Sequence, residues 1–280
     1  MSTTGSHAAT PRFAAPGSRS TSLTSRTSRP ARPARPVRLR ETWPFSWRDI
    51  GMLALSYVVM AAALVAIGLP LRHASEDHGI GGLDHRVATW LADHRNTTVN
   101  TVTWVGSTLA NTYVKIGVTA IIVLVMLRVW HRWFEAAYVA IALILEATTF
   151  ITVTMIVRRP RPDVPHLGES RVVSSFPSGH VAAAVVYGAI AVVVFWHTTR
   201  RAPRVIATVL AILVPIFVGF SRVQRGLHNL SDVIAGILLG IASLVVTTLI
   251  ALRAQERLED RLDARRALDP PPPPPDPINP

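Results

Sequence analysis

The chain has 280 residues, of which 49% are hydrophobic and 16% are charged, and its formal net charge is +12 at pH 7. Because it contains no cysteine, disulfide frameworks, thiol nucleophiles and Cys-ligated metal centres are excluded. A basic excess often indicates nucleic-acid binding, but here arginine-rich segments alternate with long apolar runs. That alternation is typical of a multi-pass membrane protein, so we exclude a soluble globular enzyme and expect no nucleic-acid partner.

Residues 1–45 are predicted to form a disordered cytoplasmic tail. They are rich in Ser, Thr, Pro, Ala and Arg, a composition too polar to bury a core. The apolar run that follows starts too late and is too long for a cleaved signal peptide. The arginines of the tail are expected to be attracted to anionic lipid headgroups.

Six apolar segments are predicted to cross the membrane as helices, because about 20 mainly apolar residues span the hydrocarbon core. The second segment fits least well, since Lys115 interrupts it. We therefore expect an all-α fold, a six-transmembrane-helix bundle over residues 46–255, with disordered tails at both ends. The six segments are 50–71, about 105–127, 136–157, 181–197, 205–221 and 233–252.

Arginine in the connections predicts the orientation of this bundle, because basic loops stay cytoplasmic. The N-terminal tail, the connections 128–134 and 198–204, and the segment after the last span are rich in arginine and fall on one side. Both termini are therefore expected to be cytoplasmic, and the near absence of lysine suggests a bacterial plasma membrane. The outward connections 158–180 and 222–232 also contain arginines, and anion binding would explain them.

The outward segment 72–104 contains three Asp-His pairs, which begin at Asp77, Asp84 and Asp93. Imidazole and carboxylate groups are zinc ligands, but glycines interrupt a helix between the first two pairs. The spacing of nine places the last two pairs on opposite helix faces. We therefore favour an amphipathic helix on the membrane surface or capping the bundle, and we predict no metal site.

Residues 256–280 are predicted to be a cytoplasmic extension that begins as a helix and ends as a proline-rich tail. Residues 253–268 have a helical pattern with Leu258 and Leu262 on one face. The six consecutive prolines of 270–275 favour polyproline II structure.

Three polar elements lie at the outer ends of predicted spans and can therefore meet at one membrane face. Guanidinium groups such as those of Arg161 and Arg222 suit the oxygens of a phosphate. Ser178 and Gly179 open a helix, and the free N–H groups of a helix N-terminus bind anions. The three elements are Arg158-Arg159-Pro160-Arg161-Pro162, Pro177-Ser178-Gly179-His180, and Ser221-Arg222 followed by His228 and Asp232.

The two histidines of these elements suit phosphoryl transfer without a metal or another cofactor. His228 and Asp232 are four residues apart, so they are neighbours on a helix. Asp232 can then accept one imidazole N–H and leave the other ring nitrogen free to attack phosphorus. His180 is available as the acid that protonates the leaving group. This set predicts a phosphohistidine intermediate.

These elements resemble the motifs of the type 2 phosphatidic acid phosphatase family, the lipid phosphate phosphatases, over about residues 46–255. The Pro-Ser-Gly-His motif and the motif of Ser-Arg, five residues, His, three residues and Asp match in full. The resemblance implies a six-helix membrane bundle in which His228 is the nucleophile, Asp232 its partner and His180 the acid. The residues that it implies as phosphate ligands are Arg161, Ser178, Gly179 and Arg222.

The first motif of the family is only partly present in this chain. The family has a lysine seven residues before the motif arginine, and that position is Thr154 here. A neutral hydroxyl cannot replace the charge of an ammonium group at a phosphate. Arg158 or Arg159 is the favoured substitute, because both lie at the phosphate end of the third span, and Lys115 is a further candidate.

The resemblance predicts an integral-membrane phosphatase that hydrolyses a lipid phosphate or diphosphate on the extracytoplasmic side. Candidate substrates are phosphatidic acid, phosphatidylglycerol phosphate, polyprenyl diphosphate and polyprenyl sugar phosphates. One alternative is a phosphotransferase that passes the phosphoryl group from His228 to an alcohol. Another is a catalytically weakened lipid-phosphate-binding protein, in which Thr154 marks a decayed site. The expected partners are the lipid substrate and the surrounding membrane lipids.

Overall fold

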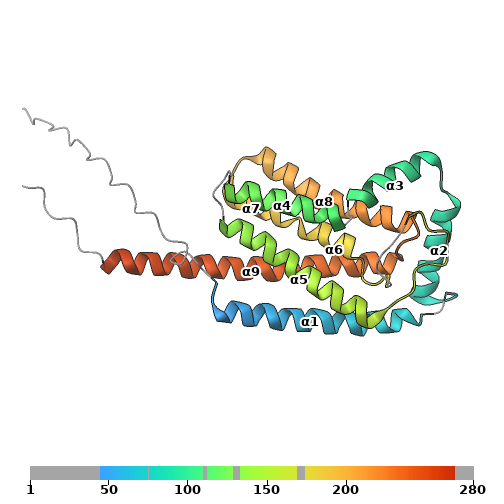
Figure 1. Ribbon diagram of the computed structural model, residues 1–280, viewed down its shortest axis with the longest axis horizontal. Coiled ribbons are helices and arrows are strands. Elements are labelled where there is room, and N and C mark those ends of the chain that lie inside the picture. The colour runs from blue at the N-terminus through green and yellow to red at the C-terminus, as the bar shows by residue number, and fades with distance from the viewer. Residues whose placement is uncertain (1–44, 75, 110–111, 129–132, 169–173, 269–280) are drawn as a thin grey trace, which may run out of the picture. The chain divides into compact units, whose positions relative to one another are not determined.

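The structure is a computed structural model that describes residues 45–268 except 75, 110–111, 129–132 and 169–173 (Figure 1). Within this range all regular structure is helical. Residues 1–44 and 269–280, which hold the predicted disordered tails, lie outside the described residues. In chain order the helices are α1 Trp47–Arg72, α2 Gly79–Asp93, α3 Thr97–Leu109, α4 Thr112–Arg128, α5 Trp133–Val157, α6 Gly179–Val186, α7 Ala189–His197, α8 Arg201–Gln224 and α9 Leu230–Leu268.

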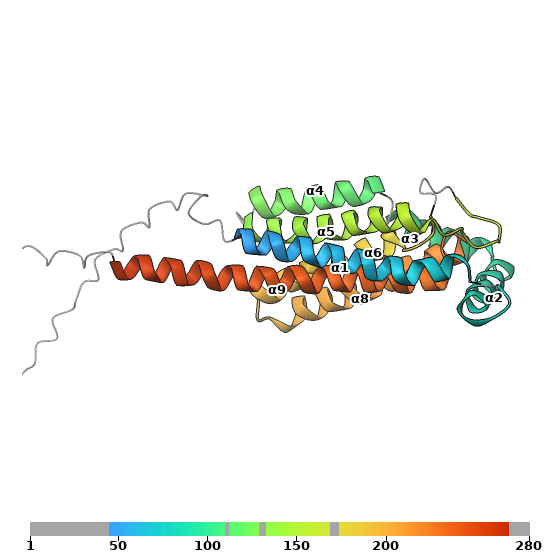
Figure 2. The same cartoon turned by 90° about the horizontal axis from the view of Figure 1, so that it is seen from below.

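Five helical segments among the described residues are long and apolar enough to cross a membrane: α1, α5, α6 together with α7, α8, and α9 as far as Ala264. They coincide with five of the six predicted spans. The structure divides the remaining one, with 105–109 in α3 and 112–127 in α4. The apolar part of α4, Gly117–Arg128, is shorter than a full span. This helix runs beside α5 (Figures 1 and 2).

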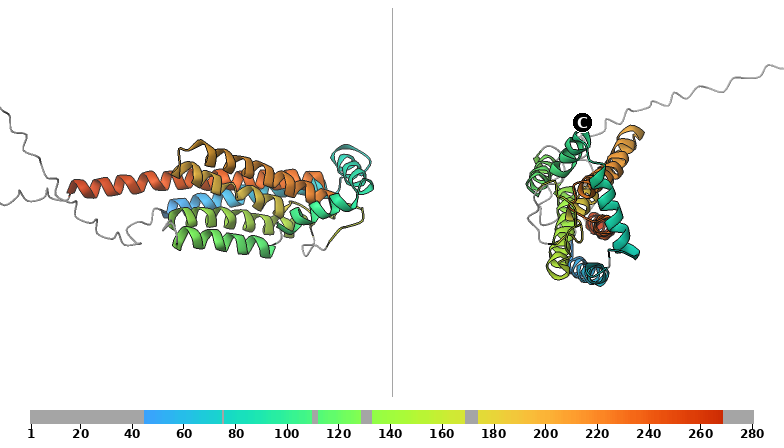
Figure 3. Two further views of the ribbon diagram at one scale, coloured as in Figure 1. Left: turned by 90° about the horizontal axis from the view of Figure 1, so that it is seen from above. Right: turned by 90° about the vertical axis from the view of Figure 1, so that its right-hand side faces the viewer.

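Helix α9 lies at the centre of the bundle, where it contacts α1, α2, α5, α6 and α8 (Figure 3). It begins at Leu230, directly after the segment that carries His228, and continues without a break to Leu268. The helix predicted over 253–268 is therefore confirmed as a continuation of the last span. The start of α9 lies at the same end of the bundle as α2 and α3, and its C-terminal end lies at the end where α1 begins (Figure 1).

Two glycines allow α6 to approach α9 closely. A Cβ atom at Gly236 would lie 2.5 Å from the carbonyl oxygen of Ser178, and one at Gly240 would lie 2.5 Å from the Cβ of Val185. Small residues four positions apart let the backbones of membrane helices come together. Their spacing in α9 therefore fixes the first turn of α6 against the first turns of α9.

Phe176 anchors the segment that leads into α6. Its side chain is fully buried in a cluster with residues of α1 and α5, which include Leu64 and Val157. Gly68 of α1 leaves room for the ring, because a Cβ there would lie 2.7 Å from it. The Pro-Ser-Gly-His segment is thereby fixed to the bundle, beside the C-terminal ends of α1 and α5, before its own helix begins.

Helix α2 lies across the end of the bundle from which α9 starts (Figures 1 and 2). Val87 and Leu91 pack against a buried cluster formed by α6, α8 and α9, whereas Trp90 is 59% exposed. A helix with one packed apolar face was expected here. Asp84 was not expected to be buried, yet it is only 3% exposed.

Candidate active site

The C-terminal ends of α5 and α8 and the N-terminal ends of α6 and α9 meet at one end of the bundle (Figure 1). The segments after α5 and before α6 are tied together, since the Ser175 N–H donates to the carbonyl of Arg159 at 2.9 Å and the Ser175 hydroxyl donates to the carbonyl of Pro160 at 2.7 Å. The Ser178 N–H donates to the carbonyl of Asp232 at 3.0 Å. All three sequence motifs therefore lie together.

The imidazole of His228 is held by a backbone carbonyl. Its Nδ1 atom lies 2.7 Å from the oxygen of Ser175, and because a carbonyl only accepts, Nδ1 carries the hydrogen in the neutral ring. The lone pair is then on Nε2. We expected Asp232 to accept this hydrogen, and that prediction is wrong, because the carboxylate of Asp232 is engaged elsewhere.

The surroundings of His228 favour its neutral form. The side chain is buried, which lowers its pKa well below the ordinary value of 6.5, and the positive charge of Arg222, the ring of His180 and the charge of Arg161 lower it further. A neutral imidazole keeps a nitrogen lone pair and can act as a nucleophile at neutral pH. The same three influences show that Arg161, Arg222 and His180 all lie within electrostatic range of His228.

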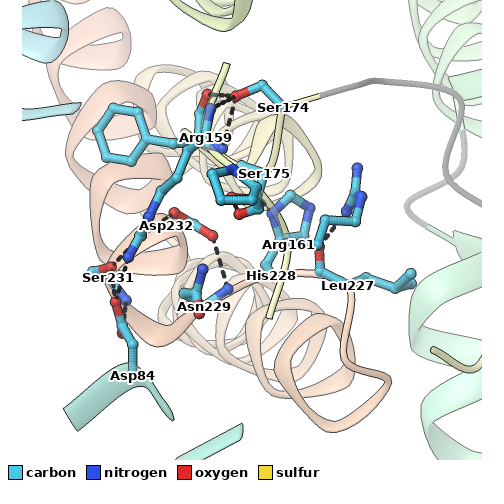
Figure 4. A network of polar contacts seen from close by, with 12 residues as sticks. Asp84, Arg159, Arg161, Ser174, Ser175, Leu227, His228, Asn229, Ser231 and Asp232 are labelled. Carbon is cyan, nitrogen blue, oxygen red and sulfur yellow. Dashed lines mark hydrogen bonds and ion pairs between the residues drawn. The ribbon is translucent and has the colours of Figure 1, made fainter. Parts of the chain in front are cut away.

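Asp232 belongs to a buried ionic network (Figure 4). Arg159 donates from Nη1 to Asp232 at 2.6 Å and from Nη2 to Asp84 at 2.9 Å. Burial by itself lowers the pKa of Arg159, but Asp232 and Asp84 outweigh that effect and raise it. The other carboxylate oxygen of Asp232 accepts the N–H of Asn229 at 2.8 Å. Asp232 therefore fixes the residue that directly follows His228.

Arg159 and Arg158 do not take the positions that we expected of phosphate ligands. Arg159 is 5% exposed and already shared by two carboxylates, so its guanidinium cannot supply the charge missing at Thr154. Arg158 is exposed, and its Nε donates to the carbonyl of Met155 in the preceding helix turn at 2.9 Å. The side chain of Lys115 lies outside the described residues.

Arg161, Arg222 and Ser178 bring hydrogen-bond donors to the region of the two histidines. Arg161 donates to the carbonyl of Leu227, the residue before His228. Arg222 donates from Nη1 to the hydroxyl of Ser107 in α3 at 2.9 Å. Among the described residues, Nε of Arg222 and the hydroxyl of Ser178 are buried without a hydrogen-bond partner. Buried polar groups are normally paired, so both atoms are available as donors to a ligand.

His180 lies in the first turn of α6, next to Gly179. Its ring and the ring of His228 are 6.4 Å apart between centroids and inclined at 58°. Gly179 brings this turn against α5, because a Cβ there would lie 2.7 Å from the ring of Phe150. The two histidines, 48 positions apart in the sequence, thus lie close to each other.

Two further arginines, which the sequence analysis did not single out as site residues, brace the outer loops. Arg95 donates to the carbonyls of Gln224 at 3.0 Å and Pro165 at 2.7 Å. Arg225 donates to the carbonyl of Asn100 at 3.3 Å, and burial lowers its pKa. Together they join the end of α8 to α3 and to the loop after α5. The only sign of their role in the sequence was that both arginines lie in predicted outward segments.

A polar cavity of about 110 Å³ adjoins this region on the side of α2, and its lining includes Arg159 and Arg161 as well as the carboxylates of Glu76, Asp84 and Asp163, but neither His180 nor His228. An apolar groove of about 260 Å³ runs between α1, α2 and α9. The cavity and the groove share Leu71 and Asp84 in their walls. Within the described part of the chain, no three His, Asp or Glu side chains gather as metal ligands.

The fold and the site define a class of protein: a helical membrane protein with histidines and arginines gathered at one end of its bundle. Residues 135–256 match the family model described as the PAP2 superfamily. The resemblance of this region to the type 2 phosphatidic acid phosphatase family is therefore confirmed. No curated protein matches the chain.

Two solved structures are similar to the chain. One is the transmembrane PAP2-type phosphatidylglycerolphosphate phosphatase from Bacillus subtilis, with a TM-score of 0.58 and 22% identity over 72% of this chain and 95% of that chain. The other is LpxE from Aquifex aeolicus, with a TM-score of 0.47 and 24% identity over 62% of this chain and 97% of that chain. The first likeness shows a common fold.

Proposed function

We propose that this protein is an integral-membrane lipid phosphatase that works through a phosphohistidine on His228. The observation that carries the proposal is the distance of 6.4 Å between the ring centroids of His180 and His228. Reacting atoms approach to about 3–3.5 Å and a general acid lies about 3 Å from its partner. Both imidazole rings are therefore close enough to contact one phosphate group and its leaving oxygen.

The reaction proceeds in two steps. The Nε2 lone pair of His228 attacks phosphorus, the bond from phosphorus to the lipid oxygen breaks, and protonated His180 gives its proton to that oxygen. Water then attacks the phosphohistidine, its proton passes to His180, and the P–N bond breaks to release inorganic phosphate and neutral His228. General acid–base catalysis of this kind accelerates a reaction about 10²–10⁴-fold.

The phosphate is held by Arg161, Arg222 and the start of α6. The Nε atom of Arg222 and the hydroxyl of Ser178 are buried donors whose partner would be a phosphate oxygen. The N–H groups at the start of α6 add the positive end of a helix dipole. These donors can surround a tetrahedral anion. Anion binding would then explain why the predicted outward loops contain arginines.

A lipid substrate is supported by the apolar groove beside the polar cavity. Leu64, Ile67, Ile234 and Leu238 line this groove on two apolar helices, where a hydrocarbon chain can remain in the bilayer. We infer that α4 completes six crossings and that the site end is extracytoplasmic. The arginines of 198–204 and of the segment after the last span support this orientation by the positive-inside rule.

The test is phosphate release by the detergent-solubilised full chain from a panel of lipid phosphates and diphosphates. His228→Ala is expected to abolish release, and His94→Ala, which alters an exposed histidine at the end of α2, is expected to retain it. Equal release by wild type and His228→Ala would contradict the proposal. Adding an alcohol separates hydrolysis from transfer, since a transferase would yield the phosphorylated alcohol.

A further inference from the structure

Asp84 of α2 reaches into the outer end of the bundle although it belongs to none of the three motifs. One carboxylate oxygen accepts the N–H of Ser231 at 2.9 Å, and the other accepts the hydroxyl of Ser231 and Nη2 of Arg159 at 2.9 Å. The residue is 3% exposed. A buried carboxylate is costly to desolvate unless it is paired and hydrogen-bonded, so this placement requires all of these contacts.

A short series of contacts leads from Asp84 to the ring of His228. Asp84 binds the guanidinium of Arg159. The backbone of Arg159 accepts the N–H of Ser175 at 2.9 Å, and the carbonyl of Ser175 lies 2.7 Å from Nδ1 of His228. Each link is a direct hydrogen bond or ion pair, and each of the four residues is at most 5% exposed.

We propose that Asp84 is a positioning residue for the nucleophile, which acts through Arg159 and Ser175. This inference rests on the proposed function of His228. Asp84 accepts a hydrogen bond from Nη2 of Arg159 and Asp232 accepts one from Nη1. These two contacts hold Arg159 in a fixed position relative to α9. The carbonyl of Ser175 then stays aligned with Nδ1, which keeps the hydrogen on that nitrogen and directs Nε2 toward the phosphate.

The chemistry of the arginine side chain supports this role. A guanidinium is a planar fork that can bind two carboxylates at once, whereas an ammonium group is a point charge on a flexible stem. Arg159 uses Nη1 for Asp232 and Nη2 for Asp84. A lysine at this position would keep the charge but could not hold both partners in the observed geometry.

A purely structural role for Asp84 predicts different results. Its carboxylate lies at the start of α9, where a negative charge is favourable to the helix dipole. If Asp84 only stabilised that helix, its loss would lower thermal stability and the yield of folded protein. The folded fraction would then keep its turnover number and the tautomer of His228.

The experiment compares Asp84→Asn, Asp84→Glu and Arg159→Lys with the matched control Asp93→Asn, an exposed carboxylate at the end of the same helix. We expect Asp84→Asn to lower kcat about 10–100-fold, because misplacement of a reacting group by about 1 Å costs about 10²-fold. KM should change less than about threefold, since Asp84 touches none of the proposed phosphate ligands. Asp84→Glu should recover part of kcat, and Asp93→Asn should equal wild type.

The second measurement is the ¹⁵N NMR signal of the His228 ring in labelled protein, assigned by its loss in His228→Gln. We expect an Nδ1–H tautomer in wild type and a mixture of tautomers in Asp84→Asn. If Asp84→Asn does not fold, the same mixture and the same loss of kcat are expected of Arg159→Lys. A single unchanged tautomer in the folded variants, or a kcat within twofold of wild type, would overturn the inference.

The NMR measurement needs no substrate, so it decides the role of Asp84 separately from the proposed function. If wild type releases no phosphate while Asp84→Asn still alters the tautomer, the proposed function fails and the positioning by Asp84 holds. If wild type releases phosphate and the tautomer is unchanged in Asp84→Asn, the proposed function holds and the positioning by Asp84 fails.

Discussion

His228 donates its Nδ1 hydrogen to the carbonyl oxygen of Ser175 at 2.7 Å. A backbone carbonyl cannot take up the proton, so it fixes the ring tautomer without changing its own charge. Asp232, four residues further on, is left to bind Arg159 and the N–H of Asn229. His228 and Asp232 are thus connected through the chain, with no direct hydrogen bond between their side chains.

This arrangement predicts that Asp232 matters for stability as well as for turnover. Asp232→Ala leaves Arg159 with Asp84 as its one carboxylate partner among the described residues and removes the acceptor of the Asn229 N–H. Removing one partner of a buried ion pair costs about 3–5 kcal/mol, so the free energy of unfolding in detergent should fall by about that amount. Denaturant unfolding of the two proteins checks this, and an unchanged unfolding midpoint would contradict it.

The lowered pKa of His228 predicts the acid limb of the pH profile. Protonated imidazole cannot attack, so kcat/KM should fall only as the pH drops through the lowered pKa, below the ordinary value of about 6.5. Because Arg161 is among the charges that lower this pKa, Arg161→Gln should move the acid limb to higher pH. Comparing both proteins on one soluble phosphate ester removes the titration of the substrate itself.

The same pKa shift affects folding stability. Below about pH 6.5 the unfolded chain binds a proton at His228 that the folded chain does not bind. His228 should therefore make the folded state progressively less stable as the pH falls through this range. An identical pH dependence of unfolding for wild type and His228→Gln would argue against a buried neutral ring.

The proposed acid, His180, is tested by the leaving group. His180→Asn should slow hydrolysis of an alkyl phosphate about 10²–10⁴-fold, since an alkoxide leaves poorly without a proton. A p-nitrophenyl ester needs little protonation, so its hydrolysis should fall much less. An equal loss on both substrates would indicate that His180 does something other than donate a proton.

Arg222 is predicted to bind phosphate through a guanidinium that a lysine cannot imitate. Its Nη1 is fixed by Ser107, and its buried Nε has no partner among the described residues. A hydrogen bond to a charged group is worth about 1.5–3 kcal/mol, so Arg222→Lys should lower kcat/KM by about 10–100-fold. Arg201→Lys, at the exposed start of α8, is the matched control and should leave kcat/KM unchanged.

The contact between α6 and α9 is predicted to be essential for the site. Gly236→Ala places a methyl group 2.5 Å from the carbonyl oxygen of Ser178, so the start of α6 must move. Overpacking costs about 1–3 kcal/mol, and both melting temperature and phosphate release should fall. Gly51→Ala is the control, because a Cβ at Gly51 has no heavy atom within 4 Å. Equal behaviour of the two variants would contradict this account.

The sequence by itself determined the helices and the positions of the motifs along them. Apolar runs of membrane-spanning length predict α1, α5, α8 and α9 closely, because the bilayer imposes length and hydrophobicity on each helix separately. The placement of the three motifs at helix ends that lie on one side of the bundle follows from the same runs. The break at Tyr187–Gly188 between α6 and α7 and the division of the second span between α3 and α4 carried no comparably clear signal.

The tertiary structure alone decided which polar groups are partners. Spacing indicated Asp232 as the partner of His228, but the ring meets Ser175, 53 positions away, and Arg159 meets Asp84, 75 positions away. Periodicity tells which residues share a helix face, and it contains no information on how loops from different helices meet. These pairings depend on how α2, α5, α6 and α9 pack at one end of the bundle, where the buried carboxylates of Asp84 and Asp232 both pair with Arg159.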